Sequence, residues 1–198
     1  MAKIVGIDEV GRGPLAGPVT ICVVACDKGV YFQLKKSRNL PKRGFDSKKL
    51  TSEERKFFCF NLKNFAREQK ISYAVVHISN TIIDERGLSF ALKKAIEKGI
   101  KKLNLNTASE ILLDGSLKAP AEFFNQRTII KGDEKEKIIS WASILAKVSR
   151  DNLMERAGKK FGYEFENHKG YATPKHRELI LQNGLSPYHR KSFCRNLT

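Results

Sequence analysis

Four acidic side chains of this 198-residue chain follow short apolar segments, and together they could do metal-ion chemistry. Asp8 and Glu9 end an apolar run near the N-terminus, and Asp114 and Asp133 follow two further apolar runs. Open α/β sheets bind their ligands at the carboxyl ends of their strands. If these segments are neighbouring strands that run the same way, the four acids converge at one edge of a sheet.

A cluster of this kind has a specific chemical use. Neighbouring carboxylates repel one another, so they either hold protons at a raised pKa or bind a cation. Oxygen ligands without Cys or His favour Mg²⁺ or Mn²⁺. Two such ions, about 3.5–4 Å apart, are a standard arrangement for in-line attack on a phosphodiester. The acids therefore predict metal-dependent hydrolysis, with two ions during catalysis.

Single acids of this set have simpler explanations. Asp114 precedes Gly115, which also suits an ordinary turn, and Asp133 also suits the start of a helix. Glu9 raises a geometrical question, because adjacent strand residues point to opposite faces. Asp8 and Glu9 share a site only if the strand ends or twists between them. The glycine-rich stretch 11–17 that follows allows such a change.

The charge of the chain indicates an anionic partner. Lys and Arg total 37 against 21 acidic residues, for a net charge of +16 and a pI of about 9.8. Nucleic acid is the usual partner of such a protein, although a lysine-rich composition alone would give the same total. The basic residues concentrate in the segments 35–49 and 168–198, which could line two walls of one groove.

Other features of the composition narrow the class of protein. The N-terminus lacks the apolar core of a signal peptide, and no run reaches about 18 apolar residues. We therefore expect a cytoplasmic protein without a membrane span, and a monomer. The four cysteines form no CxxC pair and the four histidines show no ligand spacing, so reduced structural thiols are expected.

The elements that must position the acids can be predicted from local patterns. Residues 51–54 form a capping box that begins a helix, residues 27–29 suit a hairpin turn, and Gly184 suits a helix end. The apolar periodicity predicts strands over 3–8, 19–26, 30–34, 71–78, 110–113 and 127–130, and helices over 51–69, 88–103, 136–156 and 173–184. The order indicates one mixed α/β domain, in which antiparallel strands lead into βαβ-type crossovers.

The acids lie within motifs that resemble a known family, the type 2 ribonucleases H, or ribonuclease HII of bacteria. The resemblance covers nearly the whole chain in the family's order. The matching segments are GIDEVGRGPLAGPV (6–19), DSKKL (46–50), LLDG (112–115), KGDEK (131–135), ASILAKVSRD (142–151), HKGY (168–171) and HRKSF (189–193). The combination of DEVGRGP with ASILAKVSRD is highly specific.

This resemblance implies a fold and an activity. The fold would be a ribonuclease H-like mixed sheet flanked by helices in a single domain (1–198), with a short C-terminal helical segment, from about 165 to 198, that binds substrate. The activity would be endonucleolytic cleavage of RNA paired to DNA, including a cut on the 5′ side of a ribonucleotide embedded in duplex DNA. The products would carry 3′-hydroxyl and 5′-phosphate ends, and the cofactor would be Mg²⁺ or Mn²⁺.

The resemblance also implies roles for individual residues. The metal-binding acids would be Asp8, Glu9, Asp114 and Asp133. The turn that reads the sugar would be Gly11, Arg12 and Gly13, since backbone freed by glycine can approach a 2′-hydroxyl closely. The tyrosine that reads the junction would be Tyr171, whose ring can pack against the adjacent sugar.

Basic side chains near the matching motifs are candidates for contacts to the phosphates of a nucleic acid. The candidates are Lys48, Lys147, Arg150, His168 and Lys169. Lys147 and Arg150 are three positions apart on the predicted helix, so they share one face. For these two residues, structural salt bridges are the alternative.

The chain departs from the family pattern in two places. Trp141 stands where a small residue usually precedes ASI, and the chain ends soon after HRKSF. Three alternatives remain open. Ribonuclease HIII normally has an additional N-terminal domain and a lysine at the position of Arg12. A non-catalytic nucleic-acid-binding protein would bind without turnover. A small-molecule phosphatase would need no basic loop at 35–49.

Overall fold

The computed structural model describes residues 2–40 and 50–197, and its centre is a five-stranded mixed sheet. The strands are β1 (Ile4–Val10), β2 (Val19–Cys26), β3 (Ser72–Ile78), β4 (Glu110–Asp114) and β5 (Gln126–Ile129), in the spatial order β3-β2-β1-β4-β5. β2 runs antiparallel to both β1 and β3, whereas β1, β4 and β5 are parallel to one another. The sheet thus joins an antiparallel half to a parallel half at β1.

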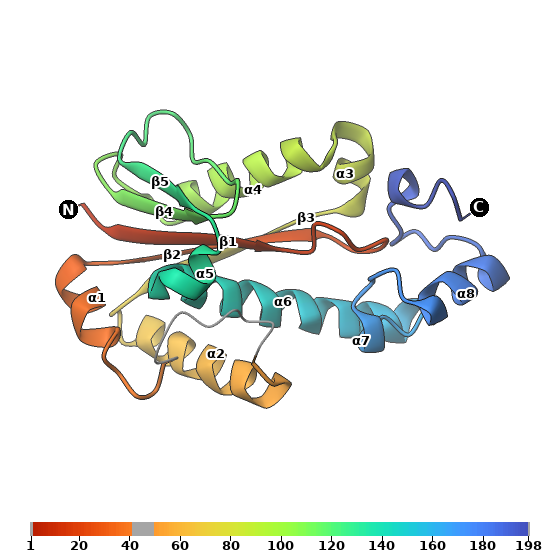
Figure 1. Cartoon of the computed structure of the whole chain (residues 1–198), viewed down its shortest axis with the longest axis horizontal. Coiled ribbons are helices and arrows are strands. Elements are labelled where there is room, and N and C mark those ends of the chain that lie inside the picture. Colours follow the sequence, from red (N-terminus) through yellow and green to blue (C-terminus); the bar gives the residue numbers. More distant parts are fainter. Residues whose placement is uncertain (1, 41–49, 198) are drawn as a thin grey trace.

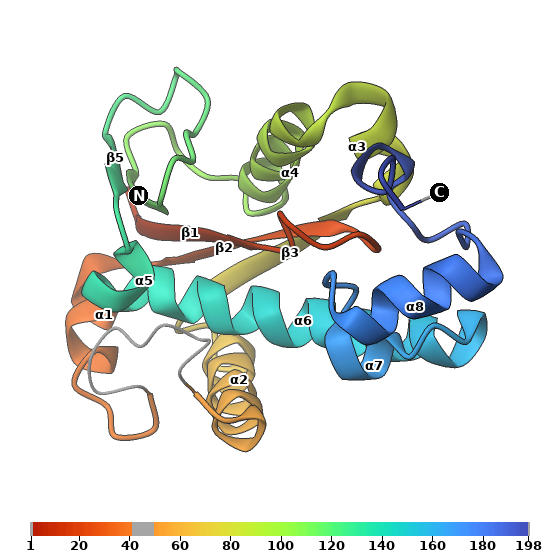
Figure 2. The ribbon, with the colours of Figure 1, turned by 45° about the vertical axis from the view of Figure 1, so that its right-hand side comes forward.

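Helices cover both faces of this sheet (Figure 1). α6 (Lys137–Phe161) and α2 (Ser52–Arg67) lie on one face, and α4 (Leu88–Lys102) lies on the other (Figures 1 and 2). The remaining helices are α1 (Lys28–Leu34), α3 (Asn80–Arg86), α5 (Gly132–Lys135), α7 (Phe165–His168), α8 (Pro174–Asn183) and the 3₁₀ turn η1 (Lys191–Phe193). None of the described helices is long and apolar enough to span a membrane.

β2 separates two hydrophobic clusters, one under each layer of helices. Cys22, Val24 and Cys26 belong to the cluster under α6, and the alternating Val23 and Ala25 belong to the cluster under α4. Side chains of a strand point alternately to its two faces, which explains the division. Because helices cover both faces, all eight residues of β2 are buried.

α6 crosses β1 at very short range, and this approach matters for the site. A Cβ atom at Gly6 would lie 2.3 Å from the carbonyl oxygen of Ile138, so only glycine fits there. The helix face is small where it meets the sheet, with Ala142 and Ala146 fully buried. The start of α6 is thereby held directly over the end of β1 that carries Asp8.

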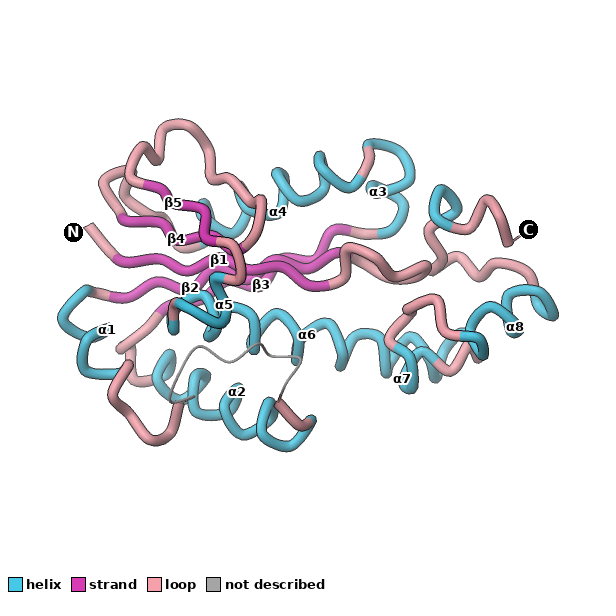
Figure 3. The backbone as a smooth tube through the Cα atoms, viewed as in Figure 1, coloured by secondary structure: helices cyan, strands magenta, loops and turns pink. Residues whose placement is uncertain are grey.

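The C-terminal segment packs as a third cluster at the far end of α6. Phe165, Ile180 and Cys194 are buried there with Met154 of α6 and Leu15 of the loop between β1 and β2. That loop, residues 11–18, reaches the C-terminal segment in Figure 3. The two parts of the chain therefore meet although they lie far apart in sequence.

Most predicted elements are confirmed. β2 has the predicted bounds, and β1, β3, β4 and β5 differ from the prediction by two residues or fewer at each end. Thr51 and Glu54 form the predicted capping box, with the Glu54 amide donating to Thr51 Oγ1 at 3.1 Å and the Thr51 amide donating to Glu54 Oε2 at 2.8 Å. The short helices α3, α5 and α7 were not predicted.

The prediction of a strand over 30–34 is wrong. This segment belongs to helix α1, and the Tyr31 amide donates to the Asp27 carbonyl across the supposed hairpin turn. Tyr31 and Leu34, three positions apart, are the buried residues of the helix. The Tyr31 ring meets the fully buried Trp141 edge to face, with 5.7 Å between ring centroids. Tertiary packing on this large side chain selects the helix over the strand.

Candidate active site

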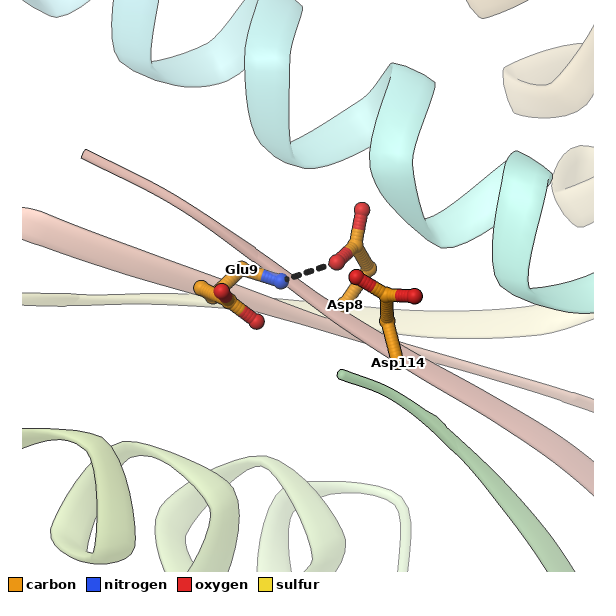
Figure 4. Close-up of side chains that lie close together, drawn as sticks. All are labelled: Asp8, Glu9 and Asp114. Carbon is orange, nitrogen blue, oxygen red and sulfur yellow. Dashed lines mark hydrogen bonds between the residues drawn. The ribbon is translucent and has the colours of Figure 1, made fainter. Parts of the chain in front are cut away.

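Three acidic side chains converge at the carboxyl end of β1, as the sequence predicts. Asp8, Glu9 and Asp114 each offer one carboxylate oxygen, and these three atoms lie within 4.8 Å of one another (Figure 4). The parallel pairing places Ile7 of β1 beside Leu113 of β4, so Asp8 and Asp114 follow at neighbouring strand ends. Strand register alone accounts for their proximity.

Glu9 reaches the group by a different route from the one expected. β1 does not end after Asp8, because regular pairing with β2 continues to Val10. Asp8 pairs with Cys22 on the α6 side of the sheet, and Glu9 pairs with Ile21 on the α4 side. β4 pairs with β1 only as far as Ile7. Carboxylates from both faces can therefore meet beside the part of β1 that extends beyond β4.

Asp8 is the most perturbed of the three acids. It is 4 % exposed. Burial is the main cause that raises the pKa of Asp8 well above its ordinary value, and the charges of Glu9 and Asp114 raise it further. Hydrogen bonds from the Ser143 side chain and from the Glu9 amide, the latter at 2.7 Å, act in the opposite direction. Such a site gains by binding either a proton or a cation.

The donor set fits a hard divalent ion. The three side chains supply only carboxylate oxygens, the ligands that Mg²⁺ and Mn²⁺ prefer. A cation would also offset the charge repulsion that raises the pKa of Asp8. Arg12 moderates this repulsion at one side, where its Nε atom lies 3.1 Å from Glu9 Oε1.

Asp133 is not part of the three-acid group. It lies in the first turn of α5, and its Oδ1 atom accepts a hydrogen bond from the Glu134 amide at 3.0 Å. Its neighbour Gly132 contacts the group directly, since the Gly132 amide donates to Asp114 Oδ1 at 2.6 Å. The structure brings the KGDEK segment to the edge of the site, and the role of Asp133 as a ligand stays a prediction.

The Gly11–Gly13 turn lies next to the acids, with Arg12 Nε 3.1 Å from Glu9 Oε1, and the HKGY segment packs against the same loop between β1 and β2. The Leu15 amide donates to the Gly170 carbonyl at 2.8 Å, which joins the HKGY segment to the loop two residues after the turn. Gly11 has a φ of +89°, a conformation that favours glycine. Tyr171 is 39 % exposed, so part of its ring is open to a partner. Two of the predicted recognition elements are thus adjacent.

Three of the residues predicted to contact phosphate form salt bridges or hydrogen bonds within the protein. Lys147 pairs with Asp151 at 2.9 Å, and Lys169 pairs with Glu155 at 2.7 Å. His168 lies between the Tyr163 carbonyl and the Gly170 amide. Lys48 lies outside the described residues.

The Arg150 side chain is buried and hydrogen-bonded to the protein backbone. It is fully buried, and its three nitrogen atoms donate to the carbonyls of Pro18, Lys169 and Ala16 at 2.9–3.1 Å. The alternative expected for this residue is a structural salt bridge, whereas these hydrogen bonds go to backbone carbonyls and give it a structural role of another kind.

Two residues near the site were missed by the sequence reasoning. Ser143 hydrogen-bonds Asp8, and Arg190 is fully buried behind the Gly11–Gly13 turn. Both lie inside motifs that resemble the family, ASILAKVSRD and HRKSF. The residues that surround this serine and this arginine in the sequence do not indicate which distant groups they contact.

Comparison with known proteins agrees with this architecture. Residues 5–196 match the family model described as Ribonuclease HII. The ribonuclease HII of Endomicrobium trichonymphae is 42 % identical over 192 residues, covering 96 % of this chain and 84 % of the relative. That of Caldicellulosiruptor bescii is 39 % identical over 195 residues, covering 98 % and 87 %.

A solved structure supports the same assignment. The ribonuclease H2 of Pyrococcus horikoshii OT3 superposes with a TM-score of 0.74 at 29 % identity, covering 98 % of this chain and 96 % of the other. The two share a ribonuclease H-like mixed sheet flanked by helices. The chain therefore belongs to the ribonuclease HII family and is an endonuclease of the ribonuclease H type.

Proposed function

We propose that the chain hydrolyses the RNA strand of RNA/DNA hybrids and cuts on the 5′ side of single ribonucleotides embedded in duplex DNA. The products would carry 3′-hydroxyl and 5′-phosphate ends. The observation that carries the proposal is the position of the three-acid group beside the Gly11–Gly13 turn, whose loop also contacts the HKGY segment. An acid group that could hold metal ions and two candidate recognition elements are gathered at one place.

The acids would hold the metal ions. Asp8, Glu9 and Asp114 supply the carboxylates, and Asp133 would complete the set from α5. Bound Mg²⁺ or Mn²⁺ would supply an activated water and stabilise the leaving oxygen. Ser143 and the Glu9 amide hold the Asp8 carboxylate in place by hydrogen bonds, and both favour its ionised, ligating form.

The neighbouring backbone and ring would recognise the ribonucleotide. A 2′-hydroxyl both donates and accepts hydrogen bonds, so a closely approaching backbone can distinguish it from a deoxyribose. A Cβ atom at Gly13 would meet no atom within 4 Å, which leaves this face of the turn open to a sugar. Tyr171 would pack against the next sugar, where an added hydroxyl would clash.

Basic side chains would hold the nucleic-acid backbone. A net charge of +16 favours a polyanion and makes its binding salt-dependent. Lys48, Lys147, His168 and Lys169 stay candidates for phosphate contacts, and Arg150 is better placed to hold the loop. A substrate-binding role for the segment from about 165 to 198, a monomeric state and a cytoplasmic location remain predictions from the sequence.

Cleavage of a DNA duplex that carries one ribonucleotide tests the proposal, with Mg²⁺ and Mn²⁺ compared. We expect a single cut 5′ to the ribonucleotide, and loss of this cut in Asp114→Asn while the duplex still binds. Full activity of Asp114→Asn would contradict the role of the acids. Cleavage of continuous hybrids alone would indicate a ribonuclease HIII-like preference. Salt-dependent binding without turnover would indicate a non-catalytic binding protein, and turnover of simple phosphate monoesters would indicate a phosphatase.

A further inference from the structure

One short C-terminal segment, residues 186–190, connects the two candidate recognition elements: it contacts the Gly11–Gly13 turn directly and reaches Tyr171 through His176. It joins the loop between β1 and β2 through backbone hydrogen bonds. The Arg190 amide donates to the Leu15 carbonyl at 2.7 Å, and the Gly17 amide donates to the Tyr188 carbonyl at 2.9 Å. Ala16 and His189 form an isolated antiparallel bridge between them. The two segments therefore behave as a short strand pair outside the main sheet.

Arg190 extends from this pair into the loop. Its side chain is fully buried, and its Nη2, Nη1 and Nε atoms donate to the carbonyls of Gly11, Arg12 and Gly17 at 2.6, 2.8 and 2.9 Å. A planar guanidinium presents its donors in a fixed arrangement, so it sets the positions of the three carbonyls relative to one another. No acidic partner pairs with it among the described residues at salt-bridge distance. The loop backbone satisfies it instead.

His189, the residue before Arg190, connects to Tyr171 on the other side. The Ser186 amide donates to His189 Nδ1 at 2.9 Å, so the proton of the neutral ring is on Nε2. That Nε2 atom lies 3.0 Å from His176 Nε2, and His176 Nδ1 lies 2.8 Å from the Tyr171 carbonyl. Only one arrangement of protons satisfies all three contacts, in which each ring donates toward Tyr171.

We propose that Arg190 and His189 are positioning residues for ribonucleotide recognition. Arg190 sets the backbone of the Gly11–Gly13 turn, and His189 sets Tyr171 through His176. Because the two residues are adjacent, they keep the sugar-reading turn and the tyrosine at a constant separation. The inference rests on the proposed function, and it adds residues that touch neither the acids nor the exposed surface.

Arg190→Lys is the first test, with kcat and KM measured on a duplex that carries one ribonucleotide. Lysine keeps the charge but cannot contact three carbonyls in a fixed arrangement. Small displacements of positioning groups can lower rates by about 100-fold, and we expect a loss of kcat/KM of that order. The inhibition constant of an all-DNA duplex should stay at the wild-type value, because the general phosphate contacts remain.

His189→Phe and His189→Gln form a matched pair. Phenylalanine keeps the edge-to-face contact with the Tyr163 ring, whose centroid lies 4.7 Å away, but removes the hydrogen bond to His176. Glutamine can still donate from a similar position. We expect His189→Phe to lower kcat/KM and His189→Gln to retain most of the wild-type value. If Arg190→Lys does not fold, the kcat/KM values of His189→Phe and His189→Gln test the proposal by themselves.

Leu62→Ala is the control for stability, since Leu62 is fully buried in α2 and belongs to the cluster under α6. It should lower the melting temperature without changing kcat/KM where it is folded. Wild-type rates in folded Arg190→Lys and His189→Phe would overturn the proposal, as would a parallel loss of affinity for all-DNA duplex. If the wild type cuts only continuous hybrids, the proposed single-ribonucleotide activity fails, and the same variants are compared on hybrid.

Discussion

The acid group and the recognition elements beside it are positioned by different means. Strand pairing places the acids, since the parallel register sets Asp8 of β1 beside Asp114 at the end of β4. Side chains place the recognition loop, since Arg150 and Arg190 together donate to five of its backbone carbonyls. The acids therefore depend on the regular sheet, whereas the loop depends on contacts over more than 130 positions of sequence. The two regions should respond differently to substitution.

The largest expected effect is on the acid group, in Asp8→Asn. Removing outer hydrogen-bond partners of a metal ligand costs about 10–100-fold, so loss of the ligand itself should cost more than about 100-fold in activity. The free energy of unfolding of the metal-free protein should rise although activity falls. Asn relieves the buried charge that raises the pKa of Asp8, and we expect the metal-free protein to gain about 0.5–2 kcal/mol.

Activity assays and urea unfolding in a chelator check both parts of this prediction. Asp8→Asn keeps an oxygen that can accept from the Glu9 amide, so the local backbone contact is retained. The stability gain of the variant should grow as the pH rises above about 4, because Asp8 then ionises in the unfolded chain while the fold still holds its proton, and it should level off once the folded Asp8 ionises. A metal-free variant less stable than the wild type would show that the acid group is not strained by its charge.

Gly11→Ala tests the recognition loop. Its φ of +89° disfavours alanine, and the new Cβ atom would lie 2.3 Å from Arg150 Nε. We expect a loss of about 1–3 kcal/mol of stability, together with weaker cleavage of the single-ribonucleotide duplex. Gly13→Ala is the matched control for stability, because no atom lies within 4 Å of its Cβ position. Equal unfolding midpoints for the two variants would contradict the close packing of Arg150 on Gly11.

Ser143→Ala should have an intermediate effect that is confined to the acid group. Without the serine hydrogen bond, the pKa of Asp8 should rise further, because that bond lowers it. Outer hydrogen bonds of this kind are worth about 10–100-fold in metal affinity, and we expect a loss in that range. Calorimetric titration with Mn²⁺ measures it. Unchanged Mn²⁺ affinity would show that the Ser143 hydrogen bond is not needed to position Asp8.

The smallest expected effect is a pH dependence of stability in the C-terminal segment. Burial is the main cause that lowers the pKa of His176 and of His189 to about 4. Unfolded histidines titrate near 6.5, so between about pH 6.5 and 4 the unfolded chain binds more protons than the fold. These two groups therefore make stability fall as the pH falls through that window.

Thermal melts between pH 7 and 4 measure this slope. His189→Gln removes one of these groups and should show a shallower decline than the wild type, since the other histidines with a lowered pKa, His77, His168 and His176, are unchanged. Asp8 acts in the opposite direction over acidic pH, so both proteins are best compared in the Asp8→Asn background. Parallel curves would show that His189 does not contribute to the acid sensitivity.

Local sequence patterns predicted the parts of this protein that depend on local interactions. The apolar runs before Asp8 and Asp114 identified β1 and β4, and residues 51–54 identified the start of α2. The motifs around these elements also indicated the family and the acidic residues of the site. Strand ends and helix caps are short-range features, so they can be recognised from a few neighbouring residues.

Tertiary structure decided what depends on distant partners. Residues 30–34 form a helix because Tyr31 packs on Trp141, more than 100 positions away. Glu9 joins Asp8 because β1 continues past the end of β4, and not because the strand stops. The buried partners of Arg190 lie more than 170 positions away. No local pattern records such contacts, since they form only when the sheet and the C-terminal segment have packed together.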